Sequence, residues 1–375
     1  MKRDLIAAAD LSLEELTRLL DLAEEMESRG GRSVCEGQIL ATLFYEPSTR
    51  TRLSFEAAML RLGGEVIGFA DPRTSSLVKG ETLADTARMV EQYADIIVIR
   101  HPLEGSAKVM ADYAAKPVIN AGDGGHEHPT QTLTDLYTLR RLRGGLEGLV
   151  VGLCGDLKYG RTVHSLAPVL AKLGAKLYCI APPELTMPQE FLTEAEENGA
   201  LLGQVTTLEE VIGELDALYM TRVQKERFER AEDYERVKGT YVVTKDSLDG
   251  AKQDMLILHP LPRVDEIAYE VDDDQRAAYF RQAGFGVPVR MALIAALLGR
   301  AGRAVLAPAE VAADRARQRP AAGEGAAARC GNARCVTQQE SYLAPELVAN
   351  VRAGARGGGT GDSTSWRCAY CEQTV

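Results

Sequence analysis

The chain has 375 residues, and its 43 Lys and Arg against 54 Asp and Glu give a formal charge of −11. A hydrophobic fraction of 45% over this length is enough for two or three domains with real cores, and it excludes wholesale disorder. The acidic balance disfavours a general nucleic-acid binder, because phosphate contacts need clustered cations, but it allows a local basic pocket for a small anion.

Membrane and secreted proteins are also disfavoured. No apolar run reaches the roughly 18 residues of a membrane helix, and the N-terminal segment has no apolar signal core. The seven cysteines show no regular framework, which argues against a disulfide-bonded fold. We therefore expect a cytoplasmic protein that binds neither membranes nor nucleic acid.

Strand-like apolar runs alternate with helical patterns through the first 300 residues. The runs that predict strands are 39–44, 95–100, 149–154, 176–181, 216–220 and 255–258, and the main helical patterns are 13–26, 53–62, 131–143 and 160–173. This alternation predicts an α/β fold with mostly parallel sheets flanked by helices. Ligands of such sheets bind beyond the carboxyl ends of the strands, and polar clusters follow five of the predicted strands here.

The first polar cluster has the composition of an anion site. Ser48-Thr49-Arg50-Thr51 lies between a predicted strand and a predicted helix. Free N–H groups at a helix N-terminus bind phosphate, and hydroxyl and guanidinium groups add charge-assisted hydrogen bonds. Ser48 or Thr49 could merely cap the helix, but the interleaved arginine after a buried strand favours anion binding.

Two histidines follow in similar positions. Arg100-His101 ends a predicted strand, and His128 begins a predicted helix. Each of the two histidines could be an ordinary structural residue. His128 and Gln131 lie three residues apart at a helix start, so they share a face and could address one bound group.

Three more clusters end the predicted strands of the second half. Gly155–Arg161 lacks the Gly-x-Gly-x-x-Gly fingerprint of a dinucleotide loop, which leaves a nicotinamide site poorly supported, while Arg161 at a helix start suits a carboxylate. Arg222 and Gln224 alternate just past a strand and project to one side. His259–Arg263 is a turn with two prolines, whose rigid carbonyls could accept hydrogen bonds from a ligand amine.

Together these strings resemble the transcarbamoylase family, and within it the aspartate branch. Residues 44–52 are similar to the carbamoyl-phosphate signature, and 128–136 to the second motif of the family. Residues 155–161, 221–224 and 259–263 resemble the aspartate branch. The resemblance covers roughly residues 1–300.

The resemblance implies a set of substrate-binding residues. For carbamoyl phosphate they are Ser48, Thr49, Arg50, Thr51, Ser75, Lys79, Arg100, His128, Gln131, Leu261 and Pro262, and for aspartate they are Lys79, Arg161, Arg222 and Gln224. Arg50, Thr51, Arg100 and His128 would act in catalysis, without a cofactor. It also implies a homotrimer or higher oligomer, in which Ser75 and Lys79 reach a neighbouring subunit's site.

The resemblance implies four segments. Residues 1–133 would bind carbamoyl phosphate, completed by a helix at 286–300, and 134–285 would bind aspartate. The Ala-rich composition of residues 301–329 predicts a linker, and residues 330–375 are expected to form a small zinc-ribbon-like module.

The four C-terminal cysteines indicate a metal site. Cys330-x4-Cys335 and Cys368-x2-Cys371 resemble the zinc domain of the regulatory chain of the same enzyme. Two close cysteine pairs in a cytosolic chain favour a structural tetrahedral zinc–thiolate site over chance pairs. The nucleotide-binding domain of that regulatory chain is absent, and regulatory-type chains are a candidate partner.

Two alternatives stay open. One is a transcarbamoylase for ornithine or another amine, although Pro260 replaces the cysteine of that branch, and Arg161, Arg222 and Arg227 favour a dicarboxylate. The other is a non-catalytic, zinc-containing assembly partner, which the intact Arg50, Arg100 and His128 disfavour.

Overall fold

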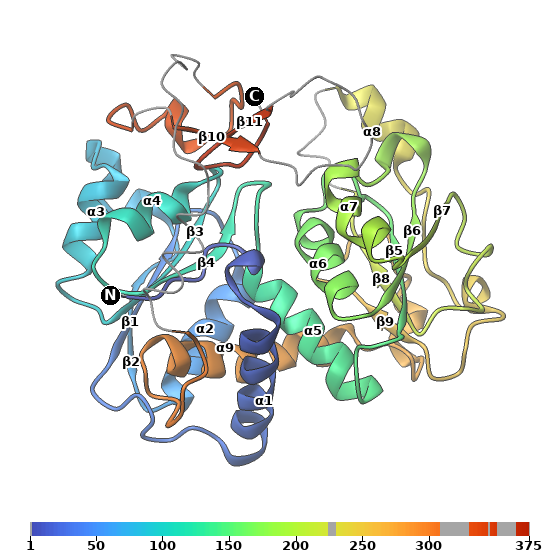
Figure 1. Ribbon diagram of the computed structural model, residues 1–375, viewed down its shortest axis with the longest axis horizontal. Helices are drawn as coiled ribbons and strands as arrows, with labels where there is room; N and C mark the ends of the chain where they lie inside the picture. The colour runs from blue at the N-terminus through green and yellow to red at the C-terminus, as the bar shows by residue number, and fades with distance from the viewer. Residues whose placement is uncertain (1, 224–229, 308–329, 344–345, 351–364, 375) are drawn as a thin grey trace, which may run out of the picture. The chain divides into compact units, whose positions relative to one another are not determined.

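The structure is a computed structural model that describes residues 2–223, 230–307, 330–343, 346–350 and 365–374. They form two compact units (Figure 1). Unit 1 comprises Met1–Ile6, Gly30–His126 and Leu293–Val375, and unit 2 comprises Ala7–Arg29 and Glu127–Ala292. These units are defined by packing, so the functional domains expected at 1–133 and 134–285 stay predictions. Most of the expected linker, residues 308–329, lies outside the described residues.

Unit 1 is built on a parallel sheet of strand order β2-β1-β3-β4. Its strands are β1 Ile39–Phe44, β2 Glu65–Phe69, β3 Ile96–His101 and β4 Val118–Asp123. Its helices include α2 Thr49–Arg61, α3 Leu83–Val90 and α4 Ser106–Tyr113. Helix α2 packs on β1 and β2, whereas α4 packs on β3 and β4 and against α3.

The C-terminal module of unit 1 contains a short antiparallel pair, β10 Leu347–Asn350 and β11 Ser365–Cys368. Its buried side chains form one hydrophobic cluster with those of α3 and α4, which includes Leu83, Ala87, Val109, Met110, Val336, Leu343 and Leu347. The module therefore shares a core with the helices that cover the first sheet.

Unit 2 is built on a second parallel sheet, of order β7-β6-β5-β8-β9. Its strands are β5 Val150–Cys154, β6 Lys176–Ile180, β7 Leu201–Val205, β8 Ala217–Met220 and β9 Leu256–Leu258. Its helices include α1 Leu13–Arg29, α5 Pro129–Arg143, α6 Arg161–Lys172, α7 Gln189–Glu197 and α8 Ala231–Val237. Helix α9, Tyr279–Leu297, begins in unit 2 and ends in unit 1.

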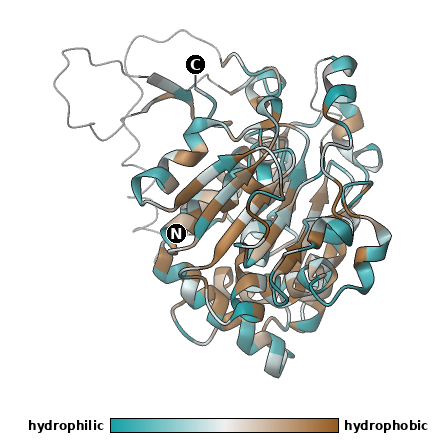
Figure 2. Ribbon diagram, turned by 90° about the vertical axis from the view of Figure 1, so that its right-hand side faces the viewer, coloured by the Kyte–Doolittle hydropathy of each residue, from teal (hydrophilic) through white to brown (hydrophobic). Residues whose placement is uncertain are grey.

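Hydropathy explains which strands the sequence reveals. Hydrophobic residues are frequent in the strands of both sheets, whereas many loop residues are hydrophilic and the helices carry both kinds (Figure 2). All six predicted strands are present, and the parallel α/β fold class is confirmed. No strand was expected at β2, β4 or β7: β2 and β7 are edge strands with exposed positions, and the buried β4 carries Asn120 and Asp123. Among the described residues, no helix combines the length and apolar character needed to cross a bilayer.

Candidate functional site

The anion motif of unit 1 lies at the junction of β1 and α2. Ser48 is the N-cap of α2 in an extended conformation (φ −158°), and its side chain makes no capping hydrogen bond. Thr49 and Arg50, in the first turn, are exposed, and Thr51 is buried. A helix N-terminus that its own N-cap side chain does not cover can direct its first N–H groups and its dipole at an anion.

Arg100 lies beside this junction because β1 and β3 pair in parallel. Phe44 is the register partner of Arg100, and the Tyr45 N–H donates to the Arg100 carbonyl at 2.8 Å. The Arg100 guanidinium contacts Glu46 Oε2 at 3.0 Å and donates to the Ala121 carbonyl at 3.3 Å. The structure therefore brings Arg100 and the Ser48–Thr51 segment together at the carboxyl ends of neighbouring strands.

His101, next in the chain, is a buried neutral group. Its Nδ1 accepts a hydrogen bond from the Leu103 N–H at 3.0 Å and lies 2.8 Å from Ser106 Oγ. Burial lowers the pKa of His101 to about 4, although Asp123 acts in the opposite direction. The protonated imidazole is thus disfavoured at neutral pH.

Ser75 and Lys79 belong to the loop that follows β2. Ser75 caps the short 3₁₀ turn Ser76–Lys79, and its hydroxyl donates to the Pro72 carbonyl at 2.7 Å. Lys79 is exposed at the end of the turn. A backbone fixed by these bonds with a solvent-facing amine is compatible with the expected role toward a second subunit.

In unit 2, His128 and Gln131 lie at the start of α5. His128 is the buried N-cap of this helix, and its Nδ1 lies 3.4 Å from Thr130 Oγ1. Gln131 is half-buried and donates from Nε2 to Asp135 Oδ1 at 2.7 Å. The expected common placement of the two residues in the first turn is therefore present.

The remaining expected residues of unit 2 follow three adjacent strands. Arg161 opens α6 after β5, Arg222 follows β8, and Leu261 and Pro262 follow β9. The tips of β5 and β8 touch: a Cβ at Gly155 would lie 2.4 Å from the Thr221 carbonyl oxygen, so this position requires glycine. Gln224 and Arg227 lie outside the described residues.

The four C-terminal cysteines form a buried cluster in which all sulfur atoms lie within 4.8 Å of one another. Cys330 Sγ lies 3.5 Å from Cys371 Sγ, and Cys335 Sγ lies 3.8 Å from Cys368 Sγ. Zn–S bonds of about 2.3 Å at tetrahedral angles place sulfurs about 3.8 Å apart, so four free thiols at these distances fit a zinc ion. Hydrogen bonds with Cys368 and Cys371 lower the pKa of Cys335, and the same contacts with Cys335 raise the pKa of Cys368 and Cys371.

Within unit 1, Glu104, just before α4, ties the segment that carries the cysteine cluster to the first sheet and its helices. The backbone N–H of Glu104 donates to the Arg334 carbonyl at 3.0 Å, and its carbonyl accepts from the Val336 N–H at 2.9 Å. Its carboxylate accepts from Asn332 Nδ2 at 2.6 Å and from the Gly125 N–H at 3.1 Å.

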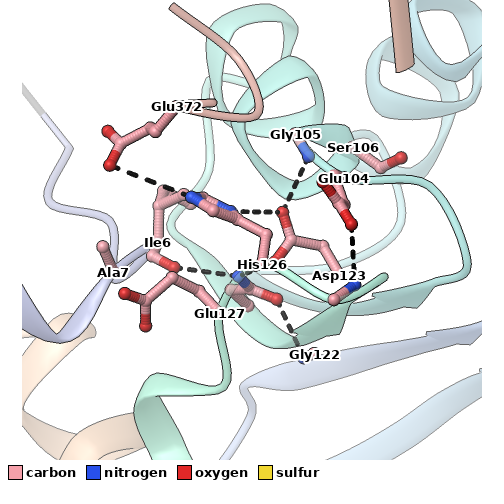
Figure 3. A network of polar contacts seen from close by, with 12 residues as sticks. Ile6, Ala7, Glu104, Gly105, Ser106, Gly122, Asp123, His126, Glu127 and Glu372 are labelled. Carbon is pink, nitrogen blue, oxygen red and sulfur yellow. Dashed lines mark hydrogen bonds and ion pairs between the residues drawn. The ribbon is translucent and has the colours of Figure 1, made fainter. Parts of the chain in front are cut away.

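A second link runs through His126 (Figure 3). Its Nδ1 lies 3.1 Å from Asp123 Oδ2, and its Nε2 lies 3.9 Å from Glu372 Oε2. Asp123 also accepts from the Gly105 N–H at 2.8 Å. The module thus contacts the loop that follows β4 by polar groups as well as through the shared core.

Sequence reasoning missed the polar residues that support the expected site. Glu104 and Asp123 belong to no motif that indicated a contact with the C-terminal segment. Asp135 lies inside the motif 128–136, yet its partners Tyr219 and Gln282 are 84 and 147 residues away. The only local signal was the spacing of Gln131 and Asp135, four residues apart on one helix face.

Two family models match the chain. The aspartate/ornithine carbamoyltransferase carbamoyl-P binding domain matches residues 3–141, and the aspartate/ornithine carbamoyltransferase Asp/Orn binding domain matches residues 147–297. Residues 298–375 lie outside both matched regions.

Full-length relatives and solved structures are also similar. The aspartate carbamoyltransferase catalytic subunit of Clostridium novyi is 57% identical over 300 residues, which cover 79% of this chain and 98% of that protein. The catalytic subunit of M. jannaschii aspartate transcarbamoylase has a TM-score of 0.73 and 47% identity, covering 80% of this chain and 98% of that chain. Trypanosoma cruzi aspartate transcarbamoylase, solved with carbamoyl phosphate and aspartate, has a TM-score of 0.74 and 38% identity, covering 78% and 96%.

The buried neutral His101 predicts an acid-sensitive fold. Its folded-state pKa of about 4 lies below the unfolded value, so its contribution is fully present above about pH 6.5 and is lost as pH falls toward 4. His101→Asn keeps an acceptor near the Nδ1 position and does not titrate. From pH 7 to pH 4, we expect the native protein to lose about 3 kcal/mol of unfolding free energy relative to the variant. Urea denaturation at several pH values measures this difference, and parallel pH curves for the two proteins would refute it.

Proposed function

The chain belongs to the aspartate/ornithine carbamoyltransferase family, and we infer that it is an aspartate carbamoyltransferase of de novo pyrimidine biosynthesis. It transfers the carbamoyl group of carbamoyl phosphate to the α-amine of L-aspartate, giving N-carbamoyl-L-aspartate and phosphate. The observation that carries this inference is the 57% identity to a catalytic subunit of which the chain covers 98%.

Carbamoyl phosphate is assigned to residues of the motifs that follow the parallel strands. Ser48, Thr49, Arg50 and Thr51 hold the phosphate, an assignment supported by the helix N-terminus that Ser48 does not cap. The two N–H bonds of the carbamoyl NH₂ go to Gln131 and to the Leu261 carbonyl in the turn with Pro262. These residues would thus bind both the phosphate and the carbamoyl NH₂ of the substrate.

Catalysis requires stabilisation of a tetrahedral oxyanion. The aspartate amine attacks the carbonyl carbon, and negative charge develops on the carbonyl oxygen. Thr51, Arg100 and His128 are the donors assigned to that oxygen, and one such donor typically contributes about 10²–10³ in rate. The leaving phosphate can accept the proton of the amine, so the protein supplies proximity and charge and needs no covalent nucleophile.

The acceptor is a dicarboxylate, which needs cations. Arg161, Arg222, Gln224 and Lys79 are assigned to the aspartate carboxylates. Arginine suits this role because its planar fork binds carboxylates in a bidentate manner. Ornithine, with a cationic side chain, would be repelled by the same groups.

Activity toward the two acceptors tests the proposal directly. We expect carbamoyl transfer to aspartate and at least about 10³-fold less transfer to ornithine, because a site built to bind a carboxylate strongly rejects an analogue that lacks it. Arg161→Gln should raise KM for aspartate at least about tenfold, the value of one lost charge-assisted bond.

Lys172→Gln is the matched control, since Lys172 lies in the last turn of the same helix and pairs with Glu194 on the surface. Its KM should equal that of the native protein. Preference for ornithine, or equal effects of the two substitutions, would contradict the assignment.

We also propose a homotrimer in which Ser75 and Lys79 complete the site of a neighbouring subunit. Arg50→Ala and Lys79→Ala should each be nearly inactive, because each removes a cation from the phosphate or carboxylate site. Dissociating and mixing the two variants should restore activity, since some sites then hold both native residues. Mixed trimers without recovered activity would argue for sites within single chains.

Finally, we propose that Cys330, Cys335, Cys368 and Cys371 bind one structural zinc ion that takes no part in catalysis. Metal analysis of the purified chain should give about one zinc per chain, and Cys368→Ser should lose most of it, because structural sites need all four ligands. Cys35→Ser is the control, as Cys35 is a buried thiol outside the cluster. Unchanged zinc in Cys368→Ser, or no zinc in the native chain, would refute the site.

A further inference from the structure

Asp135 is a fully buried carboxyl group that the proposed reaction does not use. It lies on α5 in unit 2, one turn after Gln131. Three side-chain donors converge on it: Gln131 Nε2 and Gln282 Nε2 donate to Oδ1, each at 2.7 Å, and the Tyr219 hydroxyl donates to Oδ2 at 2.8 Å. Burying a carboxyl group costs free energy of folding unless hydrogen bonds satisfy it. Three donors satisfy this one, and such a network also fixes the positions of the donors.

The contact with Gln131 fixes the orientation of its amide. Since Nε2 donates to Asp135 Oδ1, the amide oxygen of Gln131 points away from Asp135. An amide oxygen is the atom that accepts a hydrogen bond from a carbamoyl NH₂. Without Asp135, the Gln131 amide could rotate by half a turn and direct its own NH₂ toward the carbamoyl NH₂. Two donors would then face each other and no hydrogen bond would form.

Gln282, on α9, carries the network onward to the turn after β9. While its Nε2 donates to Asp135, its Oε1 accepts from the backbone N–H of His259 at 2.9 Å. Both ends of this amide have partners of the matching kind, so its orientation is fixed as well. A side chain from a third element thus ties the carboxyl group of α5 to the first residue of the turn.

His259 transmits the constraint to Leu261. Its Nδ1 accepts from the Leu261 N–H at 2.7 Å, which places the proton on Nε2, where it faces Glu266 Oε1 at 2.7 Å. Leu261 has φ of +54°, a conformation that a non-glycine residue adopts only when its surroundings impose it. The backbone that offers the Leu261 carbonyl is therefore held by the imidazole.

The geometry points to Asp135 and Gln282 as positioning residues that set both acceptors of the carbamoyl NH₂, the Gln131 amide oxygen and the Leu261 carbonyl. This inference rests on the roles proposed above for Gln131 and Leu261. Burial raises the pKa of Asp135 to about 7 against the opposing hydrogen bonds and the nearby Arg290, which shows how strongly the interior disfavours this charge. A carboxyl group at this position accepts several hydrogen bonds at once, which an apolar residue cannot do.

The test is a double-mutant cycle in the full-length enzyme, with kcat and both KM values measured for each protein. Gln131→Ala, Asp135→Leu and the double variant form the cycle. We expect Asp135→Leu to lower kcat about 30-fold in the native background and less than about threefold in the Gln131→Ala background. Most of its effect acts through Gln131, because the Gln282 Oε1 bond to the His259 N–H still holds the turn of Leu261 when Asp135 is replaced. KM for aspartate should stay within about twofold, since the lost contact serves the other substrate. Asp135→Asn, which keeps an oxygen toward the two glutamines, should recover most of kcat.

Two further variants separate positioning from folding. Thr138→Val, on the same helix, removes a buried hydroxyl that donates to the Thr134 carbonyl at 2.7 Å, and it should lower the melting temperature without changing kcat. If Asp135→Leu does not fold, Gln282→Met takes its place in the test. Gln282→Met should also lower kcat, and Asp135→Asn is then not part of the comparison.

The outcomes distinguish this inference from its premise. If Gln131→Ala leaves the kinetics unchanged, the role proposed for Gln131 is wrong and the inference falls with it. Two results would refute the inference while the proposed function stands, provided that Gln131→Ala itself lowers kcat. One is that Asp135→Leu lowers kcat by the same factor in the native and the Gln131→Ala backgrounds. The other is that Asp135→Leu lowers the melting temperature and leaves kcat unchanged.

Discussion

The inner strands of each sheet, among them β1 in unit 1 and β5 in unit 2, are hydrogen-bonded in parallel to a neighbour on both sides. Parallel pairing makes all strands of a sheet end at the same edge. Arg100 therefore lies beside Phe44, and Met220 beside Cys154, although each pair is more than 50 residues apart in sequence. The polar residues that follow these strands gather at the two edges as a consequence, and the chemistry of each unit depends on that register.

This constraint explains why much of the architecture is predictable from sequence. Buried strands of a parallel sheet are continuous apolar runs, so β1, β3, β5 and the others of this kind were predicted within a residue or two. The edge strands β2 and β7 lack this signal because part of each faces solvent, and β4 lacks it because Asn120 and Asp123 are buried with hydrogen-bond partners. Of the motif residues, Arg100 lies near the end of β3, Arg161 and Arg222 follow strands, and Gln224 and Arg227 lie outside the described residues. The roles expected for all of them stay predictions.

What the sequence does not reveal is which polar groups hold those residues in place. A buried carboxyl group such as Asp135 looks like any acidic helix residue until the partners from β8 and α9 are known. Glu104 is equally inconspicuous, although it accepts hydrogen bonds from two segments more than 200 residues apart. Such contacts depend on tertiary structure alone, so no local pattern or propensity encodes them.

The shared core of α3, α4 and the C-terminal module has a consequence for biosynthesis. The ribosome makes Tyr113 about 200 residues before Cys330, and translation at about 5–20 residues per second separates them by about 10–40 s. During that interval the cluster that contains Leu83, Ala87 and Met110 lacks the residues that the C-terminal module contributes to it. Until the C-terminal module emerges, the incomplete apolar cluster favours aggregation or chaperone binding. A product terminated before Cys330 would keep that apolar surface exposed.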